Sequence, residues 1–518
     1  MAALRLGVIT TIYVTANITL TQMYTVTAIL PHVQRALSIV GQCGGGNASL
    51  CYLNASLLAG GAYGRHFRVD LGGSLTLWGM ALVGGSCGNG GCAIYVDATS
   101  SLSVVNCLLQ GNAYDAKAPS GSGPCAGGAV CFVDGAGDGA FTDTTFAQNV
   151  GSYGGAIWSF GFRSLFLVRV NFLGNLADGD GGALYVSQPG GFRGVSVQIV
   201  DCNFSGNAAS GNGGGLSVGN SNNFIMDVTV TVIRSSFVAN VAKTTGGAVF
   251  VDGSLRMSQT RLESNRAGGD GGALYLNGRM SSFQNTIHWA TDSSSFFNNT
   301  AGGYGGAASF SFSASYSATA VMLINSSFST NTAQASGGAV YLSNGGQIRM
   351  LVQTCAFSGN SVRAPGAIVG TDIGTDSSAT YYTDALTTTV DPRNSPCMTF
   401  SCAVAYTTTT PCVYPRSASY SGILASASAC GLGTAFSTNV PQMSDVNWQA
   451  GQCGDLCDPL AFRTALSACG TQCPPPPSSP PPSPPHPPPS PSPPPPPSPP
   501  PKASRGDAAA MSAINSSW

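Results

Sequence analysis

Charged residues are scarce in this sequence of 518 residues. Asp, Glu, Lys and Arg together make up 8% of it, against about a quarter in an average soluble domain. Lysine and glutamate are rarest, at Lys117, Lys243, Lys502 and Glu263, so surface helices built on Glu–Lys pairs are not expected. The net charge of −1 gives no basic patch, which argues against nucleic acids and anionic membranes as partners.

Long apolar runs are also missing, although 43% of the residues are hydrophobic. No stretch approaches the 18 or so apolar residues that span a bilayer, so we expect no transmembrane segment. The first residues, MAALRLGVITTIYVTANITL, are interrupted by Thr, Tyr and Asn, unlike a signal peptide. Seventeen cysteines nevertheless favour an oxidising compartment, and we therefore expect an N-terminally incomplete gene model.

What the sequence does contain is a repeat. A Phe-x-x-Asn element is followed, eight or nine residues after its Phe, by Gly-Gly-Ala and a short apolar run. The copies begin at Leu109, Phe146, Phe172, Phe204, Phe237, Leu262, Phe296, Phe328 and Phe357. Their steps vary from 25 to 37 residues, which predicts loops inserted at one turn of an otherwise fixed unit.

Short β-rich segments at this period, with no helical periodicity, predict an all-β right-handed parallel β-helix with about three strands per coil. The Phe side chains would stack inside the coils. The Asn side chains would hydrogen-bond from rung to rung at a turn, and the Gly pairs would form the next corner.

The paired GGA-[ILV] and FxxN elements resemble the repeats of chlamydial polymorphic outer-membrane proteins, which belong to the pectin-lyase-like superfamily of parallel β-helices. The resemblance is clearest over residues 100–370. Upstream, TVTAILPHVQRALSIVG and GGSLTLWGMALVGG look like opening coils of such domains, so we assign residues 1–395 to the β-helix. The chain departs from the family at its C-terminal end, in residues 396–518.

The proline tract at residues 474–501 contains 21 Pro, six Ser and one His, a composition that favours an extended polyproline II shaft. Its Ser-Pro-Pro runs resemble hydroxyproline-rich wall glycoproteins of green algae and plants, which implies secretion and O-glycosylation. A plain linker or a ligand for profilin or SH3 domains is the alternative. Residues 502–518 are expected to be a disordered tail.

The cysteines fall into three groups. Eight lie in residues 396–473, which we expect to be a disulfide-stapled segment, with zinc binding as the alternative: Cys397, Cys402, Cys412, Cys430, Cys453, Cys457, Cys469 and Cys473. Local disulfides are expected for Cys43 with Cys51, Cys87 with Cys92, and Cys125 with Cys131. Buried positions in the stack are expected for Cys107, Cys202 and Cys355, each two residues before a repeat Phe or Leu.

Catalytic residues are not evident. Asp97 and Asp134 each lie six residues after a Gly in successive coils and are the candidates for paired carboxylates, with turn residues as the alternative interpretation. The Gly-His-Gly and paired-Asp pattern implied by a resemblance to polygalacturonases is missing. We predict no metal and no cofactor, with Ca²⁺ as the alternative on which lyase chemistry would depend.

Two other groups of residues point to a surface role. Outward positions after Gly-Gly-Ala carry aromatic side chains that could face glycans or pack across strands, namely Trp158, Tyr185, Phe250, Tyr275 and Tyr341. Asn-x-Ser/Thr sequons permit N-glycosylation at Asn17, Asn47, Asn54, Asn203, Asn298, Asn325 and Asn515.

We therefore predict a secreted, non-enzymatic structural or adhesive protein of an extracellular matrix or cell wall. It would bind polysaccharides or wall glycoproteins through an extended β-helix face. The alternatives are a pectin-lyase-like polysaccharide lyase or hydrolase, and the ectodomain of a surface protein whose anchor is missing.

Overall fold

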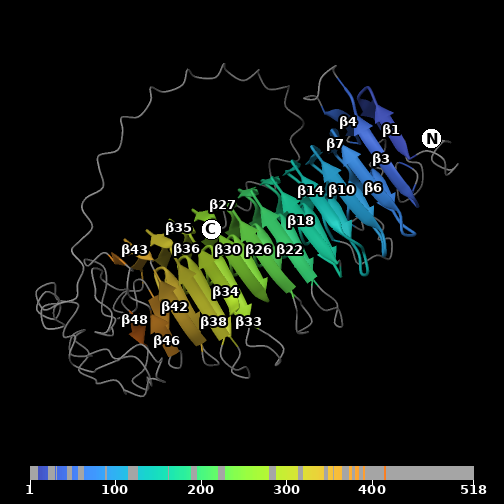
Figure 1. Ribbon diagram of the computed structural model, residues 1–518. Coiled ribbons are helices and arrows are strands. Elements are labelled where there is room, and N and C mark those ends of the chain that lie inside the picture. Colours follow the sequence, from blue (N-terminus) through green and yellow to red (C-terminus); the bar gives the residue numbers. More distant parts are fainter. Residues whose placement is uncertain are drawn as a thin grey trace, which may run out of the picture. The chain divides into compact units, whose positions relative to one another are not determined.

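The computed structural model shows a right-handed parallel β-helix, and every element of the residues that it describes is a β-strand (Figure 1). The described residues are 10–20, 30, 32–43, 50–55, 64–87, 90–114, 126–161, 163–187, 195–219, 228–278, 287–312, 319–343, 348–353, 355–363, 373–375, 380–383, 389–390 and 413–415. The predicted Cys-rich segment, apart from 413–415, and the proline tract lie outside them.

The strands form four parallel sheets, which we call sheets A, B, C and D. Sheet A consists of β1 (Thr11–Val14), β3 (Ala36–Gly41), β6 (Ser74–Trp78), β10 (Ser101–Val105), β14 (Gly139–Thr142), β18 (Ser164–Val168), β22 (Val195–Val200), β26 (Val228–Ile233), β30 (Ser254–Ser258), β34 (Ile287–Asp292), β38 (Thr319–Ile324), β42 (Ile348–Gln353) and β46 (Thr380–Thr383). Sheet B consists of β2 (Ile18–Thr19), β4 (Cys51–Asn54), β7 (Met80–Val83), β11 (Leu108–Gln110), β15 (Thr145–Ala147), β19 (Asn171–Leu173), β23 (Asn203–Ser205), β27 (Ser236–Val238), β31 (Arg261–Glu263), β35 (Ser295–Phe297), β39 (Ser327–Ser329), β43 (Ala356–Ser358) and β47 (Thr389–Val390).

The other two sheets complete each coil. Sheet D consists of β8 (Ser86–Cys87), β12 (Ala113–Tyr114), β16 (Val150–Gly151), β20 (Leu176–Ala177), β24 (Ala208–Ala209), β28 (Val241–Ala242), β32 (Arg266–Ala267), β36 (Thr300–Ala301), β40 (Thr332–Ala333) and β44 (Ser361–Val362). Sheet C consists of β5 (Phe67–Val69), β9 (Ile94–Val96), β13 (Val130–Phe132), β17 (Ile157–Phe160), β21 (Leu184–Ser187), β25 (Leu216–Val218), β29 (Val249–Asp252), β33 (Leu274–Gly278), β37 (Ala308–Phe312), β41 (Val340–Ser343), β45 (Ile373–Thr375) and β48 (Val413–Pro415).

One coil runs through sheets A, B, D and C in that order, as in β18, β19, β20 and β21. The expectation of about three strands per coil was therefore one too low. The additional strand is that of sheet D, which is only two residues long where it follows the repeat Asn, and two residues are too few to show an alternating pattern.

The repeat Phe side chains stack on one another inside the coils, as predicted. Phe172 and Phe204 lie 4.5 Å apart between ring centroids, as do Phe204 and Phe237, and both pairs are nearly parallel. Phe296 and Phe328 continue the stack beyond Leu262, at 4.7 Å. All five rings are fully buried, so the stack forms the centre of the hydrophobic core.

The repeat Asn side chains form a continuous buried ladder. In each step the Oδ1 of one Asn accepts both the backbone N–H and the side-chain N–H of the Asn in the preceding rung, at 2.9 and 2.9 Å from Asn175 to Asn207. The Asn207 side chain also donates to the carbonyl of Phe172, at 3.0 Å. The ladder includes Asn112, Asn149, Asn175, Asn207, Asn240, Asn265, Asn299, Asn331 and Asn360. Its amides therefore hold consecutive rungs in register.

A second ladder of small polar side chains runs two residues before the repeat Phe. The Ser235 hydroxyl accepts the backbone N–H of Cys202 at 3.1 Å and donates to the Ile233 carbonyl at 2.9 Å. Cys202 occupies the same position one rung earlier, where its sulfur accepts the N–H of Val170 at 3.4 Å. Cys107 and Cys355 are also buried at this position, as predicted.

The glycine pairs form the corner that leads into sheet C. Gly181 has a φ of +69°, which side chains rarely adopt, and a Cβ on Gly182 would collide with the carbonyl oxygen of Gly214 in the next rung. The positive φ recurs at Gly154, Gly213, Gly246, Gly271, Gly305 and Gly337, and the close approach to the next rung recurs at Gly128, Gly155, Gly214, Gly247, Gly272 and Gly306.

Two of the predicted local disulfides are confirmed, between Cys43 and Cys51 and between Cys87 and Cys92. Cys131 is also disulfide-bonded, and its expected partner Cys125 lies outside the described residues.

Asn207→Ala tests the asparagine ladder. The substitution leaves two N–H groups of Asn175 and the Phe172 carbonyl buried without their partner, and each such group costs about 1 to 3 kcal/mol. We expect the free energy of unfolding, measured by urea titration, to fall by about 3 kcal/mol or more. Asn203→Ala is the matched control: Asn203 lies in the same rung, on the outer face, and accepts the Ser236 hydroxyl, so its loss should cost less than about 1 kcal/mol. Equal losses would contradict the role of the ladder.

Cys202→Ser tests the second ladder through its pH dependence. Burial raises the pKa of the Cys202 thiol to about 11. Above about pH 9 the unfolded chain loses this proton while the folded chain retains it, so stability falls by about 1.4 kcal/mol per pH unit up to the folded pKa. Because Ser235 and Ser294 hold the same position, the variant should match the wild type at pH 7 and lose less stability between about pH 9 and 10.5. Identical losses in urea titrations over this range would refute the assignment.

Candidate functional site on the outer faces

The outer surface is divided by two ridges of residues in the left-handed backbone conformation. The A–B ridge joins sheets A and B, with φ between 46° and 54°, and consists of Asn106, Asp143, Arg169, Asp201, Arg234, Gln259, Ser293 and Asn325. The B–D ridge joins sheets B and D, with φ between 53° and 63°, and consists of Gly111, Gln148, Gly174, Gly206, Ala239, Ser264, Asn298, Thr330 and Gly359. Each ridge residue directly precedes a buried residue at a ladder position, so the ridge residues other than glycine place their side chains on the outside.

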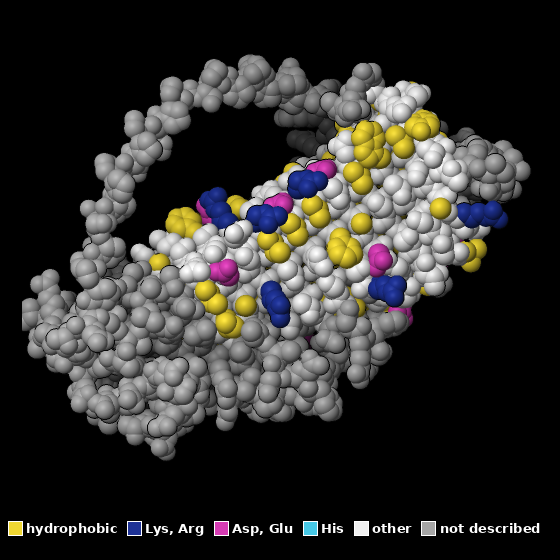
Figure 2. Space-filling model, viewed as in Figure 1, with side chains coloured by type: hydrophobic (Ala, Val, Ile, Leu, Met, Phe, Trp, Pro, Cys, Tyr) yellow, Lys and Arg dark blue, Asp and Glu magenta, His cyan; other side chains and the backbone are white. Residues whose placement is uncertain are grey.

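Charges on the A–B ridge neutralise one another. Arg169 donates to both carboxylate oxygens of Asp143, at 2.6 and 2.8 Å, and Arg234 does the same for Asp201, at 2.8 and 2.9 Å. These hydrogen bonds lower the pKa of both carboxyl groups. The ridge therefore carries alternating charges with no net field, and Figure 2 shows such basic and acidic side chains side by side along one edge of the sheet that faces the viewer.

A column of mostly hydrophobic, half-buried to exposed side chains lies on the outer face of sheet A, beside this ridge. In-register outward positions of eight consecutive rungs carry Tyr13, Val40, Trp78, Val105, Thr142, Val168, Val200 and Ile233. Tyr13 is 61% exposed, and Phe166, in the neighbouring outward column, is 38% exposed. We call these residues, with Phe166, the sheet A strip. The sequence does not reveal this strip because the strands of sheet A carry no repeat motif, although they alternate between inward and outward residues.

The aromatic residues that the sequence proposed as glycan-facing form a column on sheet C. Trp158, Tyr185 and Tyr341 are only 5%, 6% and 3% exposed, and the first two belong to a second small hydrophobic cluster with Tyr95 and Cys131. Burial raises the pKa of Tyr185 to about 12. This burial favours packing over ligand binding for these three.

Phe250 and Tyr275 in the same column are half-buried and stack at 5.6 Å between ring centroids. They keep more accessible surface than the other three proposed aromatics, so they are the part of this column that could contact a ligand.

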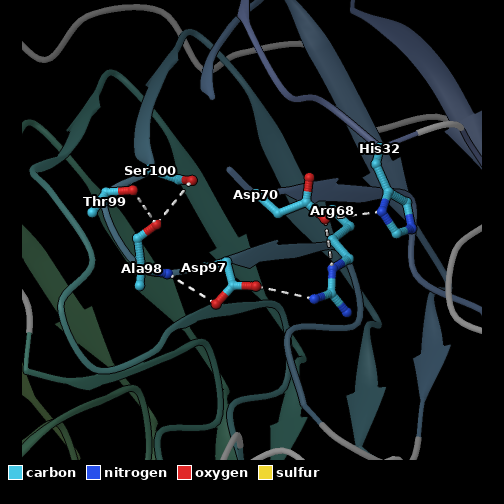
Figure 3. Close-up of polar contacts among 7 residues, drawn as sticks. All are labelled: His32, Arg68, Asp70, Asp97, Ala98, Thr99 and Ser100. Carbon is cyan, nitrogen blue, oxygen red and sulfur yellow. Dashed lines mark hydrogen bonds and ion pairs between the residues drawn. The ribbon is translucent and has the colours of Figure 1, made fainter. Parts of the chain in front are cut away.

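A polar cluster lies at the first rungs of sheet C. The Arg68 guanidinium bridges Asp70 and Asp97, at 3.1 and 3.0 Å, and Nδ1 of His32 is 2.9 Å from the same oxygen of Asp70 (Figure 3). Asp97 also accepts the backbone N–H of Ala98. The cluster links the segment before β3 to the ends of β5 and β9, so these ionisable side chains stabilise the packing of the first rungs.

The two candidate catalytic carboxylates occupy different registers. Val96 pairs with Phe132, so Asp97 is in line with Val133, and Asp134 follows one residue later at an exposed turn. Asp97 is already held by Arg68. A catalytic role for Asp97 and Asp134 stays a prediction, and this arrangement adds nothing to it.

Other buried ionisable groups also have structural partners. Asp180 and Asp270 accept backbone N–H groups of the next rung, from Asn212 at 2.6 Å and from Tyr304 at 2.8 Å, while burial raises both pKa values. Burial lowers the pKa of His66 to about 4, so the imidazole is neutral at pH 7. Its Nε2 lies 3.1 Å from the Leu53 carbonyl oxygen. Within the described part of the chain, no group of three or more His, Cys, Asp or Glu could hold a metal ion.

Comparisons with known proteins place the repeat in context. The Chlamydia polymorphic membrane protein repeat matches residues 169–187 and 325–343. Both matches start at an A–B ridge residue and end in sheet C, at Ser187 of β21 and Ser343 of β41. The comparison with curated proteins and the comparison with solved structures found no match.

Among the described residues, no helix is long and apolar enough to cross a membrane. The chain therefore forms a right-handed parallel β-helix with repeats similar to those of Chlamydia polymorphic membrane proteins. Such repeats are typical of surface, adhesin-like proteins.

Proposed function

We propose that this chain is a non-enzymatic, secreted structural or adhesive protein of an extracellular matrix or cell wall, and that it binds glycans through the sheet A strip. The similarity of its repeats to a surface-protein repeat supports an external location. Support for the binding mode comes from the strip itself, a mostly apolar column with exposed Tyr13 and Phe166 and half-buried Trp78, beside a ridge whose paired charges cancel.

The chemistry of the strip suits a sugar polymer. Tyr13, Trp78 and Phe166 present aromatic rings, and the apolar faces of sugar rings pack against such surfaces. Parallel strands repeat every 4.8 Å or so, so equivalent contacts recur along the sheet and an extended chain could follow them. Since neighbouring carboxylates are already paired with arginines, electrostatic attraction would contribute little.

Phe166→Ala is the test of this face. The full chain is incubated with insoluble neutral and acidic wall polysaccharides such as cellulose, xylan and pectin, and bound protein is measured. The variant should bind its preferred polysaccharide roughly tenfold more weakly, because one lost aromatic contact is worth about 1.4 kcal/mol.

Phe297→Ala is the matched control, since Phe297 is 42% exposed but lies on sheet B. Equal losses in the two variants, or no binding by the wild type, would refute binding through the strip. Binding should also persist from low to high salt, whereas a steep decline would indicate charge-driven attachment. New reducing ends that disappear in an Asp97→Asn variant would instead establish an enzyme.

A further inference from the structure

Two of the seven sequons begin at exposed ridge residues. Asn298 is on the B–D ridge and Asn325 is on the A–B ridge, both exposed and both with a left-handed backbone, at φ 55° and 48°. In each case the middle residue of the sequon is a buried ladder residue, Asn299 or Ser326. The third, Thr300 or Ser327, is in the strand that follows.

The side-chain amides at these two positions can carry a substituent without breaking the stack. The Asn298 amide donates to the Ser264 hydroxyl at 3.1 Å, and the Asn325 amide donates to Asp292 at 3.1 Å. A carboxamide nitrogen has two N–H bonds, so one can be replaced while the other keeps its hydrogen bond. Neither side chain belongs to the core.

The other described sequons differ. Asn203 lies within β23, partly buried, and its Oδ1 accepts the Ser236 hydroxyl of the next rung at 2.9 Å. Asn54 lies within β4, and the Oδ1 of Asn17 accepts a hydrogen bond from the backbone N–H of Tyr52 at 3.0 Å. Asn47 and Asn515 are outside the described residues.

We infer that Asn298 and Asn325 are N-glycosylation sites and that the folded protein selects them over Asn203. In the reaction, a bond forms between Nδ2 and C1 of the sugar while the bond from C1 to the diphosphate of a lipid-linked oligosaccharide donor breaks, and one amide proton leaves. This inference rests on the external location proposed above, because the donor is met during secretion.

The two glycans would have a local effect on the surface. Asn298 and Asn325 lie on opposite sides of sheet B in adjacent rungs, next to β35 and β39, where Phe297 is exposed. Glycans at both edges shield this part of sheet B. Sheet A at those rungs is flanked by only one of the two sites.

The experiment uses the full chain with an added signal sequence, secreted from a eukaryotic host, and site occupancy is measured by mass spectrometry before and after enzymatic release of N-glycans. We expect occupied Asn298 and Asn325 and an unmodified Asn203. Asn298→Gln and Asn325→Gln should each remove one glycan without loss of secreted protein. Unmodified ridge sites, or an Asn203 as fully occupied as they are, would overturn the inference.

The repeat also offers a gain-of-site test. Thr330 follows Asn298 by one rung on the B–D ridge, and Ser293 precedes Asn325 by one rung on the A–B ridge. Thr330→Asn and Ser293→Asn each complete a sequon with residues already present, at positions 332 and 295. In an Asn298→Gln, Asn325→Gln background, each should restore one glycan, and failure of both would contradict ridge geometry as the determinant. The outcome is independent of the polysaccharide assay, so the two proposals fail separately.

Discussion

The buried asparagine ladder is the constraint on which the rest of the structure depends. An amide inside an apolar core is costly unless all its hydrogen-bonding groups are paired, and here the partners of Asn207 come from the rungs on both sides of it. Every coil must therefore bring its Asn to the same corner at the same height. The Phe stack and the glycine corners then follow as the groups that fill and turn a coil of that fixed geometry.

The ladders fix the residues inside each corner and leave the outward positions free to vary, so any binding residues must lie at those outward positions. The corners before sheets B and D are fixed by buried residues such as Ser235 and Asn240, so the residue before each is exposed and free to vary. Arginine, aspartate, serine and asparagine all occur there. The outward positions of sheet A are similarly unconstrained, and the exposed aromatic residues on this face have no role in the core.

The core of the fold could be predicted from the sequence because its determinants recur. Phe204 and Asn207 have counterparts in neighbouring copies, and Cys202 was assigned as buried because other copies carry small residues there. The binding face could not be predicted in the same way. The ring of Tyr185 packs against Tyr153, which lies in the turn before sheet C, so no alternation within a strand reveals that contact, and Trp158 stacks on Phe160 of its own strand rather than facing solvent. Phe166 has no counterpart in other rungs, so a repeat comparison passes over it.

The uniform bonding of the ladder has a consequence for how this molecule can evolve. Asn175, Asn207 and Asn240 make the same bonds to their neighbours, so a chain lacking one whole coil would bring Asn175 against Asn240 with every amide still paired. For the ladder the coils are thus interchangeable units, and tandem duplication or loss of the coding sequence of one coil changes the number of coils without leaving a ladder amide unpaired. The length of the β-helix can therefore change while the side chains on its outer faces stay the same.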